Sequence, residues 1–398
     1  MSARPLRRNR DFQLLQLGQL LSSTGTQATA IAYPLIVLAV THSAAKAGVV
    51  GFARTVPLAL LALPAGDAAD RWNRKRLMIA ADGIRAAAVG GLAVVILLDR
   101  VVFWAIPLVA FVEGAGTALF SAAQPGALRA VVPVPQLPAA LGARAGREAT
   151  AELAGPPLGG ALFGLARGLP FLVDAVSYGF STLCLLVIRV PFQEPRGTEV
   201  SRPWDGFRFL WREPFLRTSA LLLGLANFLD TGLLLALVVI GRRQGLSAGA
   251  VGALVGAFAA CVLLGSLLSP LVRRLLTVRA VLLVELWTWL GCALFLIRPS
   301  VYVLTAGILP TALAIPSTDS VVHGYRIAIT PDRLLGRAES ARRTISLVLA
   351  PLGPLAAGVL LGAVSARATI AVFAACGLVL ALWGTTSASI RAAPKLDM

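Results

Sequence analysis

Long apolar runs separated by short polar connections dominate this chain. A helix needs roughly 20 apolar residues to cross the hydrocarbon core of a bilayer, and twelve runs reach about that length. They predict membrane-spanning helices over Phe12–Val40, Ala47–Ala65, Leu77–Leu98, Val101–Ala122, Ala149–Leu165, Leu169–Val190, Phe215–Ile240, Ala248–Val272, Val278–Ile297, Val301–Val322, Ile345–Ser365 and Thr369–Ile390. The pattern therefore predicts an all-α membrane protein with twelve transmembrane helices.

The composition agrees with immersion in lipid. The 398 residues are 57% hydrophobic and 14% charged, and the mean hydropathy is +0.80. A soluble core of this size could not bury so much apolar surface. The formal net charge of +17 is spread in short patches between the apolar runs rather than gathered on one soluble face, so we expect no nucleic-acid partner.

The positions of Lys and Arg predict the orientation of the spans. Cytoplasmic connections carry an excess of these residues. If the amino terminus is cytoplasmic, most of the 36 basic residues fall on the cytoplasmic side, with Arg242 and Arg243 as a local exception. An even number of spans places both termini together. We therefore expect a multi-pass protein of the cell membrane with both termini in the cytoplasm.

The longest connection divides the chain into two halves. Residues 191–214 mix Pro, Gly, Glu and Arg, which is typical of a linker. We expect an amino-terminal six-helix bundle over residues 1–190 and a carboxy-terminal six-helix bundle over residues 215–398.

The two halves also resemble each other in sequence. Ala47–Gly51 is echoed by Gly249–Gly252, and Val132–Gly160 is echoed by Thr330–Gly358, each about half the chain later. A parallel repeat of six spans is a property of one class of secondary transporters.

A charged segment, Gly66–Arg76, interrupts the apolar pattern between the second and third runs. With Gly66, Asp70, Arg71, Arg74 and Lys75 it resembles the Gly-x-x-x-Asp-Arg-x-Gly-Arg-Arg signature of the major facilitator superfamily. Asn73 stands in place of the second glycine, and asparagine also tolerates the left-handed backbone angles of a turn.

A second motif lies on the fifth span. Gly142 and the run Gly155-Pro156-Pro157-Leu158-Gly159-Gly160 resemble the motif of the superfamily's antiporters, with Ala151 where a glycine is usual. Ala81–Ala86 and Phe207–Leu210 resemble the branch that contains enterobactin and macrolide exporters. The resemblance covers essentially the whole chain, and it implies two pseudo-symmetric six-helix bundles and a secondary active transporter.

The first motif implies a conformational latch. In the family, the carboxylate that corresponds to Asp70 faces the start of span eleven, where a helix amino terminus stabilises it by up to about 2 kcal/mol. Arg71, Arg74 and Lys75 would then pair with Asp82, Glu148 or Glu339. The alternative is that these cations only set the topology by staying in the cytoplasm.

The fifth-span motif implies a close helix contact. Gly155, Gly159 and Gly160 lack side chains and let a neighbouring helix approach, and Pro156 interrupts the backbone hydrogen bonds and bends the span. We expect a tight interface between the two halves here. Plain packing is the alternative, because small residues are common in membrane helices.

Ionisable residues inside spans are costly and are candidates for function. Glu113 falls near the middle of span four and is the best candidate for binding a proton or a cation. Arg54 and Asp230 both fall in the outer halves of their spans, where they could form a gate between the bundles. Asp319 lies on span ten, and Gln27 belongs to a polar stripe on span one.

Three further positions enter through the resemblance. Related exporters often carry a carboxylate near Gly25, where this chain has Thr26. Asp174 and Glu285 fall on spans six and nine, which are usually peripheral in the family, so we assign both a structural role.

Other function classes do not fit. The chain has no Gly-x-x-x-x-Gly-Lys-[Ser/Thr] loop for ATP. Its two histidines are distant from each other and supply no catalytic cluster, and its four cysteines have no Cys-x-x-Cys spacing for a metal or a disulfide framework. We expect a transporter rather than an enzyme, with no cofactor beyond the proton gradient.

The sequence thus predicts a proton-coupled exporter of a small amphipathic organic compound, such as a drug, a siderophore or a secondary metabolite. The alternative is a proton-coupled importer or an uncoupled facilitator of the same fold. The expected partners are the substrate, protons and the lipid bilayer, and we expect a monomer.

Overall fold

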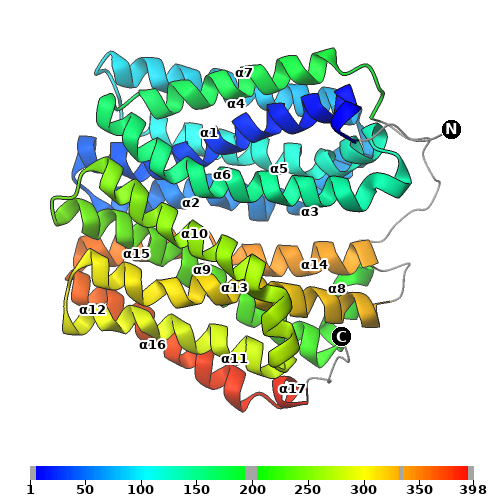
Figure 1. Cartoon of the computed structure of the whole chain (residues 1–398). Coiled ribbons are helices and arrows are strands. Elements are labelled where there is room, and N and C mark those ends of the chain that lie inside the picture. The colour runs from blue at the N-terminus through cyan, green and yellow to red at the C-terminus, as the bar shows by residue number, and fades with distance from the viewer. Residues whose placement is uncertain (1–5, 193–203, 331–334, 393–398) are drawn as a thin grey trace. The chain divides into compact units, whose positions relative to one another are not determined.

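The computed structural model describes residues 6–192, 204–330 and 335–392, and every regular element in these ranges is helical (Figure 1). The elements of the first half are η1 (Leu6–Arg8), α1 (Arg10–Thr41), α2 (Ala44–Leu60), α3 (Ala62–Arg71), α4 (Arg74–Leu97), α5 (Ala105–Val131), η2 (Val134–Gln136), α6 (Leu137–Leu165) and α7 (Leu169–Val187). Those of the second half are α8 (Trp204–Arg212), α9 (Pro214–Arg243), α10 (Ala248–Leu275), α11 (Val278–Thr288), η3 (Trp289–Ala293), α12 (Leu294–Ile297), α13 (Val301–Ile329), α14 (Leu335–Val348), α15 (Leu352–Ala363), α16 (Ala366–Thr386) and α17 (Ala388–Arg391).

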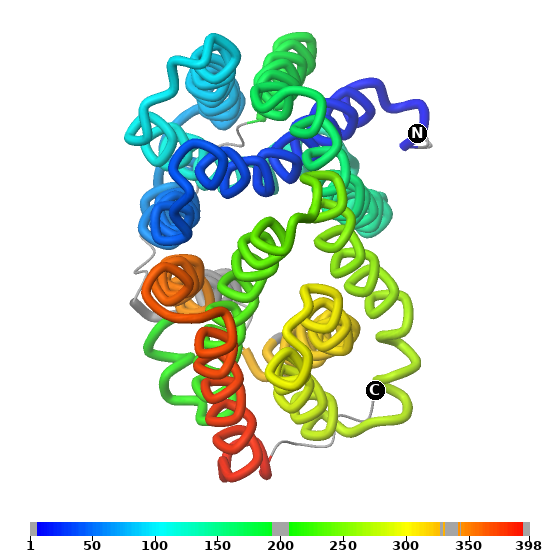
Figure 2. The backbone as a smooth tube through the Cα atoms, turned by 90° about the vertical axis from the view of Figure 1, so that its left-hand side faces the viewer, coloured from blue at the N-terminus to red at the C-terminus, as the bar shows by residue number. Residues whose placement is uncertain are grey.

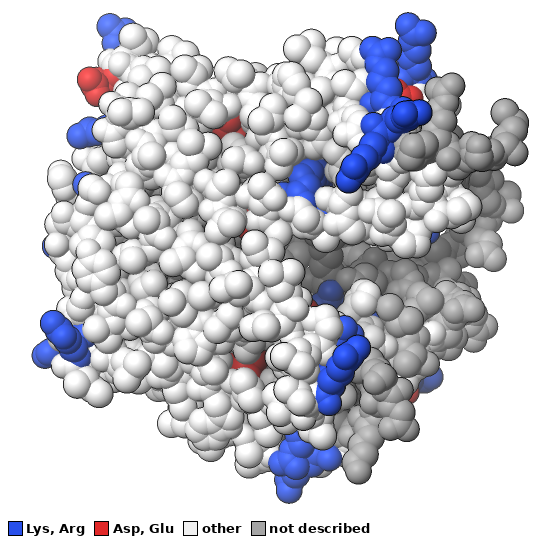
Figure 3. Space-filling view, viewed as in Figure 1, with Lys and Arg blue, Asp and Glu red and all other residues white. Residues whose placement is uncertain are grey.

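All twelve predicted runs fall on helices. Within the described ranges, ten helices are long and apolar enough to span a membrane, and the bent pair α2–α3 raises this number to eleven. Helix α6 carries the remaining run, where glycine, proline and glutamate lower the hydropathy. The prediction of an all-α membrane protein is therefore confirmed, and the helices are consistent with twelve spans. The face shown in Figure 3 carries few charged side chains, as contact with lipid requires.

The second predicted run differs most from its expected form. It consists of α2 and α3, which meet at a bend of 51°. Pro57 lies one turn before the break and has no N–H to donate to the preceding turn. Residues 193–203, most of the predicted linker, lie outside the described residues. The linker ends in α8, which packs against α9 and α14.

The helices group into two compact units. Unit 1 comprises Met1–His42, Ala53–Glu199 and Ser247–Gly256, and unit 2 comprises Ser43–Phe52, Val200–Leu246 and Ala257–Met398. Each unit thus contains most of one predicted half, together with the first turns of one helix from the other half, α10 in unit 1 and α2 in unit 2.

In unit 1, α1 packs against both α6 and α7, and α4 lies beside α7 (Figures 1 and 2). Glycines set these distances. A Cβ atom at Gly25 of α1 would lie 2.7 Å from Ser177 Oγ of α7, and one at Gly159 of α6 would lie 2.7 Å from the Cα atom of Ala28. The helix backbones can therefore touch, as small residues allow in membrane proteins.

The repeated segments build the same helix crossing twice. In unit 2, a Cβ atom at Gly48 of α2 would lie 2.6 Å from the carbonyl oxygen of Pro354. In unit 1, a Cβ atom at Gly252 of α10 would lie 2.5 Å from the carbonyl oxygen of Pro156. Each segment of the first repeat pair therefore packs against a segment of the second pair.

The glycine contacts lead to a first prediction. Gly159→Ala should force α1 and α6 apart and lower the free energy of unfolding by about 1–3 kcal/mol, as overpacking of a tight site does. Gly164→Ala is the matched control, because no atom lies within 4 Å of a Cβ at this position of the same helix. Thermal unfolding in detergent measures both variants, and equal midpoints would contradict the prediction.

Candidate functional site

Glu113 of α5 lies at the centre of a polar cluster inside unit 1. Its side chain is 1% exposed. The Tyr33 hydroxyl of α1 donates to Oε2 at 2.7 Å, and the Arg54 guanidinium of α2 donates to Oε1 at 3.3 Å. Arg54 also donates to the carbonyl oxygen of Thr26 at 2.9 Å. Both carboxylate oxygens therefore have a donor, one of them a cation.

Two glycines beside Glu113 make this arrangement fit. A Cβ at Gly114 would meet the backbone of Arg54, so the glycine lets α2 approach α5. A Cβ at Gly116 would lie 2.7 Å from Cγ of Arg85, so that glycine leaves room for a side chain from α4. The two glycines that follow Glu113 in the sequence Glu-Gly-Ala-Gly thus make room for Arg54 of α2 and Arg85 of α4 beside α5.

Arg85 forms the second ion pair of this cluster. Its guanidinium pairs with Asp82, three residues earlier on α4, and donates to Thr117 Oγ1 at 3.3 Å. The Cζ atom lies 4.3 Å from the centroid of the Tyr178 ring and 5.1 Å from that of Phe120. Ring faces attract a desolvated guanidinium, so the aromatic side chains help to hold Arg85 in the interior.

Asp174 of α7 completes the cluster and is fully buried. Thr29 Oγ1 of α1 donates to Oδ2 at 3.0 Å, and Ser177 Oγ donates to Oδ1 at 3.2 Å. One turn further along α7, the Tyr178 hydroxyl lies 2.8 Å from Thr26 Oγ1. The α1–α7 contact is therefore polar at this depth.

A smaller polar group lies nearer the first turns of α1. Gln19 Oε1 accepts hydrogen bonds from Gln124 of α5 and Arg147 of α6, and all three side chains are buried. Burial lowers the pKa of Arg147 to about 10, partly offset by Glu148. The guanidinium stays charged at neutral pH and links three helices of unit 1.

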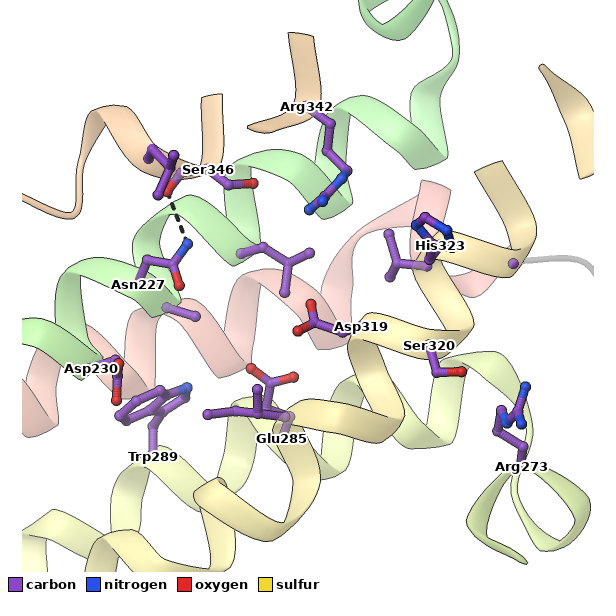
Figure 4. A pocket seen from close by; sticks show the side chains of 16 residues that line it. Asn227, Asp230, Arg273, Glu285, Trp289, Asp319, Ser320, His323, Arg342 and Ser346 are labelled. Atoms are coloured by element: carbon purple, nitrogen blue, oxygen red, sulfur yellow. Dashed lines mark hydrogen bonds between the residues drawn. The ribbon is translucent and has the colours of Figure 1, made fainter. Parts of the chain in front are cut away.

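Unit 2 contains a cavity of about 680 Å³ (Figure 4). Its polar lining comes from five helices: Asn227 and Asp230 of α9, Arg273 of α10, Glu285 of α11, Asp319, Ser320 and His323 of α13, and Arg342 and Ser346 of α14. Figure 4 shows Asp230 and Glu285 near the Trp289 ring, with Arg342, His323 and Arg273 toward the other side. The cavity is acidic and aromatic at one end and basic at the other.

The wall that carries Trp289 depends on a change of helix type. Span nine passes from α11 into the 3₁₀ segment η3 at Trp289, and Gly291 of that segment lies against Gly307 of α13 backbone to backbone. On the opposite wall, Asn227 Nδ2 donates to the carbonyl oxygen of Ser346 at 2.9 Å. Burial lowers the pKa of Arg342 from its usual value, and nearby Asp319 acts in the opposite direction.

The residues of the predicted latch lie on and after α3. The ion pairs there are Arg71–Asp67 at 2.8 Å and Arg74–Asp70 at 3.4 Å, and the Asp70 side chain is 78% exposed. Lys75 donates to the backbone carbonyl of Leu186. Gly66 has no atom within 4 Å of a Cβ position.

Two of the three carboxylates expected as partners pair with other cations, and a pairing with Glu339 stays a prediction. Asp82 pairs with Arg85, Glu148 pairs with Arg144 and Arg147, and the side chain of Glu339 lies outside the described residues. Asn73 is extended, with φ at −65°, and caps α4 by accepting from the Arg76 N–H. The prediction that Asn73 takes the left-handed backbone angles of a turn was therefore wrong. Its backbone is extended because its side chain caps a helix.

Other predicted residues are placed as follows. Gly155 and Gly159 pack against α1, where Gln27 lies against Gly155, while Gly160 and Pro156 contact the first turns of α10. Arg54 forms its ion pair with Glu113 inside unit 1, and Asp230 and Asp319 line the cavity of unit 2.

Sequence reasoning treated Asp174 and Glu285 as structural, and the structure places both at polar sites in the interior. Their position inside apolar runs was the sequence signal that could have identified them as candidate site residues. Trp289 had no such signal, because a tryptophan is common in a membrane span.

The Glu113 site leads to a second prediction. Glu113→Gln removes the charge that faces Arg54. Breaking a buried ion pair typically costs 3–5 kcal/mol, and we expect about 2–3 kcal/mol here because the Arg54 side chain is 20% exposed. Adding Arg54→Gln should restore part of this loss. Asp67→Asn is the control: its carboxylate is 58% exposed, its partner Arg71 is 73% exposed, and the change should cost at most about 1 kcal/mol. Thermal unfolding in detergent tests the series, and strictly additive losses would contradict it.

Comparison with known proteins agrees with these observations. The chain is 27% identical to the multidrug efflux pump Tap of Mycobacterium tuberculosis over 97% of this chain and 94% of that one. It is 26% identical to macrolide efflux protein A of Enterococcus faecalis over 34% of this chain and 42% of that one. Its fold matches that of a bacterial homologue of the human lysosomal transporter Spinster, solved in an inward-facing and unoccupied conformation, with a TM-score of 0.75 and 17% identity over 98% of both chains.

The sequence profile of the Major Facilitator Superfamily matches residues 15–284, which is more than half of the chain. Together with the helical membrane fold, this match shows that the chain is a multi-pass membrane transporter for small molecules and belongs to the Major Facilitator Superfamily.

Proposed function

We propose that this transporter exports a small amphipathic organic compound in exchange for protons, by alternating access. The observation that carries the proposal is the cavity of unit 2, with three carboxylates beside an indole ring. The names of the relatives that align with nearly the whole chain, multidrug efflux pumps, support export over import.

The cavity has suitable dimensions and chemistry for such a substrate. Ligand pockets commonly measure about 300–1,000 Å³, and this one measures about 680 Å³. Asp230 and Glu285 would attract a basic nitrogen, and Trp289 offers a flat apolar face. We infer that the preferred compounds carry a positive charge next to an apolar ring system.

The same carboxylates support proton coupling. Asp319 is exposed to the cavity, and Glu285 is buried in its wall. A bound cation and a bound proton would compete for the negative charges of these two carboxylates. No cofactor is needed for this exchange. Exchange of one monovalent cation for one proton moves no net charge, so the pH difference across the membrane, rather than the membrane potential, would drive export.

The remaining expectations complete the proposal. We place both termini in the cytoplasm from the distribution of Lys and Arg, and we propose that the protein works as a monomer. Asp70 acts as a latch that stabilises one conformation. An importer or an uncoupled facilitator of the same fold is the alternative function.

Ethidium, a flat aromatic cation, is a suitable probe in inside-out membrane vesicles with an acidic lumen. With the membrane potential clamped by valinomycin and potassium, wild-type vesicles should accumulate ethidium and their lumen should become more alkaline as it enters. Vesicles without the protein are the control. Ethidium entry without proton movement would indicate a facilitator, and proton-driven loss of ethidium from the lumen would indicate an importer.

The latch is tested by a matched pair of variants. Asp70→Asn should reduce ethidium accumulation several-fold while the amount of protein in the membrane stays unchanged, because the amide keeps the shape and removes the charge. Asp67→Asn removes the neighbouring carboxylate, which also forms an exposed i,i+4 ion pair, and should transport like the wild type. Equal losses in both variants, or a loss of expression alone, would favour a role in topology only.

A further inference from the structure

The polar cluster around Glu113 in unit 1 holds three carboxylates, those of Asp82, Glu113 and Asp174, and two guanidinium groups, those of Arg54 and Arg85. Arg54 pairs with Glu113 and Arg85 pairs with Asp82. Among the described residues, no Lys, Arg or His nitrogen lies within 4.0 Å of the Asp174 carboxylate. Of the three carboxylates, that of Asp174 is therefore the one that forms no ion pair among the described residues.

The surroundings of Asp174 are polar but uncharged at close range. Its two oxygens face the hydroxyl groups of Thr29 and Ser177, and its exposure is 0%. Gly25 provides the space on α1, since a Cβ there would clash with Oδ1. The site is therefore a built pocket for this carboxyl group rather than a chance contact.

Charged groups surround the pocket at longer range. Arg85 from α4, Arg54 from α2 and Glu113 from α5 interact with Asp174 electrostatically. Helix α1 contributes the hydroxyl group of Thr29. Helix α6 carries its ionisable side chains between Arg144 and Glu152, and residues 153–165, which lead into the α6–α7 connection, carry none. In the part of the chain that the structure describes, no neighbouring helix therefore places a cation in direct contact with the Asp174 carboxylate.

Physical chemistry then favours the neutral acid. An ionised carboxylate buried without a cation costs several kcal/mol, more than two hydroxyl donors return. With all five groups ionised, the cluster would carry one net negative charge. One proton removes that charge.

We propose that Asp174 is a proton-binding site, that it carries the proton in this conformation, and that Arg85 is the cation that pairs with it when the proton leaves. This inference rests on the proposed exchange of protons and names a site for it. It is separate from the carboxylates of the cavity in unit 2.

The position of Arg85 supports its part in this proposal. Its guanidinium already lies over the ring of Tyr178, which follows Asp174 by one turn on the same face of α7. When the O–H bond of the carboxylic acid breaks and the proton passes to water, the new carboxylate competes with Asp82 for Arg85. Loading and release of a proton would thus change the contact between α4 and α7.

The first experiment is independent of transport. The infrared spectrum of the purified protein at neutral pH should contain the carbonyl band of a protonated, buried carboxylic acid, and Asp174→Asn should remove that component. Asp67→Asn, which changes an exposed carboxylate of the same unit, should leave the band unchanged. An identical band in the wild type and in Asp174→Asn would overturn the proposal.

A milder variant covers the case in which Asp174→Asn does not fold. Thr29→Val keeps the shape of the side chain and removes a donor that stabilises the ionised form. The band should then persist to a pH about one unit higher than in the wild type, the shift expected for a hydrogen bond of ordinary strength. An unchanged titration would count against Asp174 as its source.

The second experiment uses the ethidium vesicles. Asp174→Asn, which cannot release a proton, should move fewer protons per ethidium than the wild type, and Asp67→Asn should match the wild type. Full proton movement in Asp174→Asn would overturn the inference. If the wild type itself moves no protons, the proposed antiport fails, and the infrared result alone decides whether Asp174 binds a proton.

Discussion

Enclosing charge among membrane-spanning helices is the constraint on which the rest of this structure depends. Neither lipid nor apolar side chains can solvate an ion, so each buried charge needs a partner supplied by another helix or another turn. In unit 1, Glu113 is satisfied by α1 and α2, and Arg85 by its own helix and two aromatic rings. Because five helices, α1, α2, α4, α5 and α7, contribute to one cluster, their relative positions depend on it.

The glycines follow from the same constraint. A short carboxylate such as Asp174 reaches its donors on α1 only if the helix backbones nearly touch, and Gly25 permits this approach. Gly114 and Gly116 do the same on either side of Glu113. Close helix packing and the neutralisation of buried charges therefore depend on the same glycines. The helix crossings of both repeats also depend on backbone contact at glycine.

Much of the fold could be predicted from the sequence, because hydropathy and length report directly on spans. All twelve runs are helical, and the positions of Glu113 and Asp319 inside spans already marked them as candidates. The bend between α2 and α3 and the 3₁₀ segment at Trp289 could not be predicted, because both depend on local backbone geometry.

The partners of the buried charged side chains also could not be predicted from the sequence. Spans that are apolar on every side show no periodicity that would tell which face of a helix points inward, so the sequence could not show that Arg54 meets Glu113 or that Asp174 meets α1. Apparent peripheral position was a poor guide for Asp174 and Glu285, since even an outer helix has one face directed at its neighbours.

Positions 25 and 174 share a single volume. The space that a side chain at position 25 would need is filled by the carboxyl group that α7 projects toward α1. The two positions are therefore not free to vary independently in evolution: a relative that keeps a carboxylate at 174 must keep glycine at 25, and a relative that gains a side chain at 25 must shorten residue 174. In an alignment of relatives, residues at positions 25 and 174 should therefore change together.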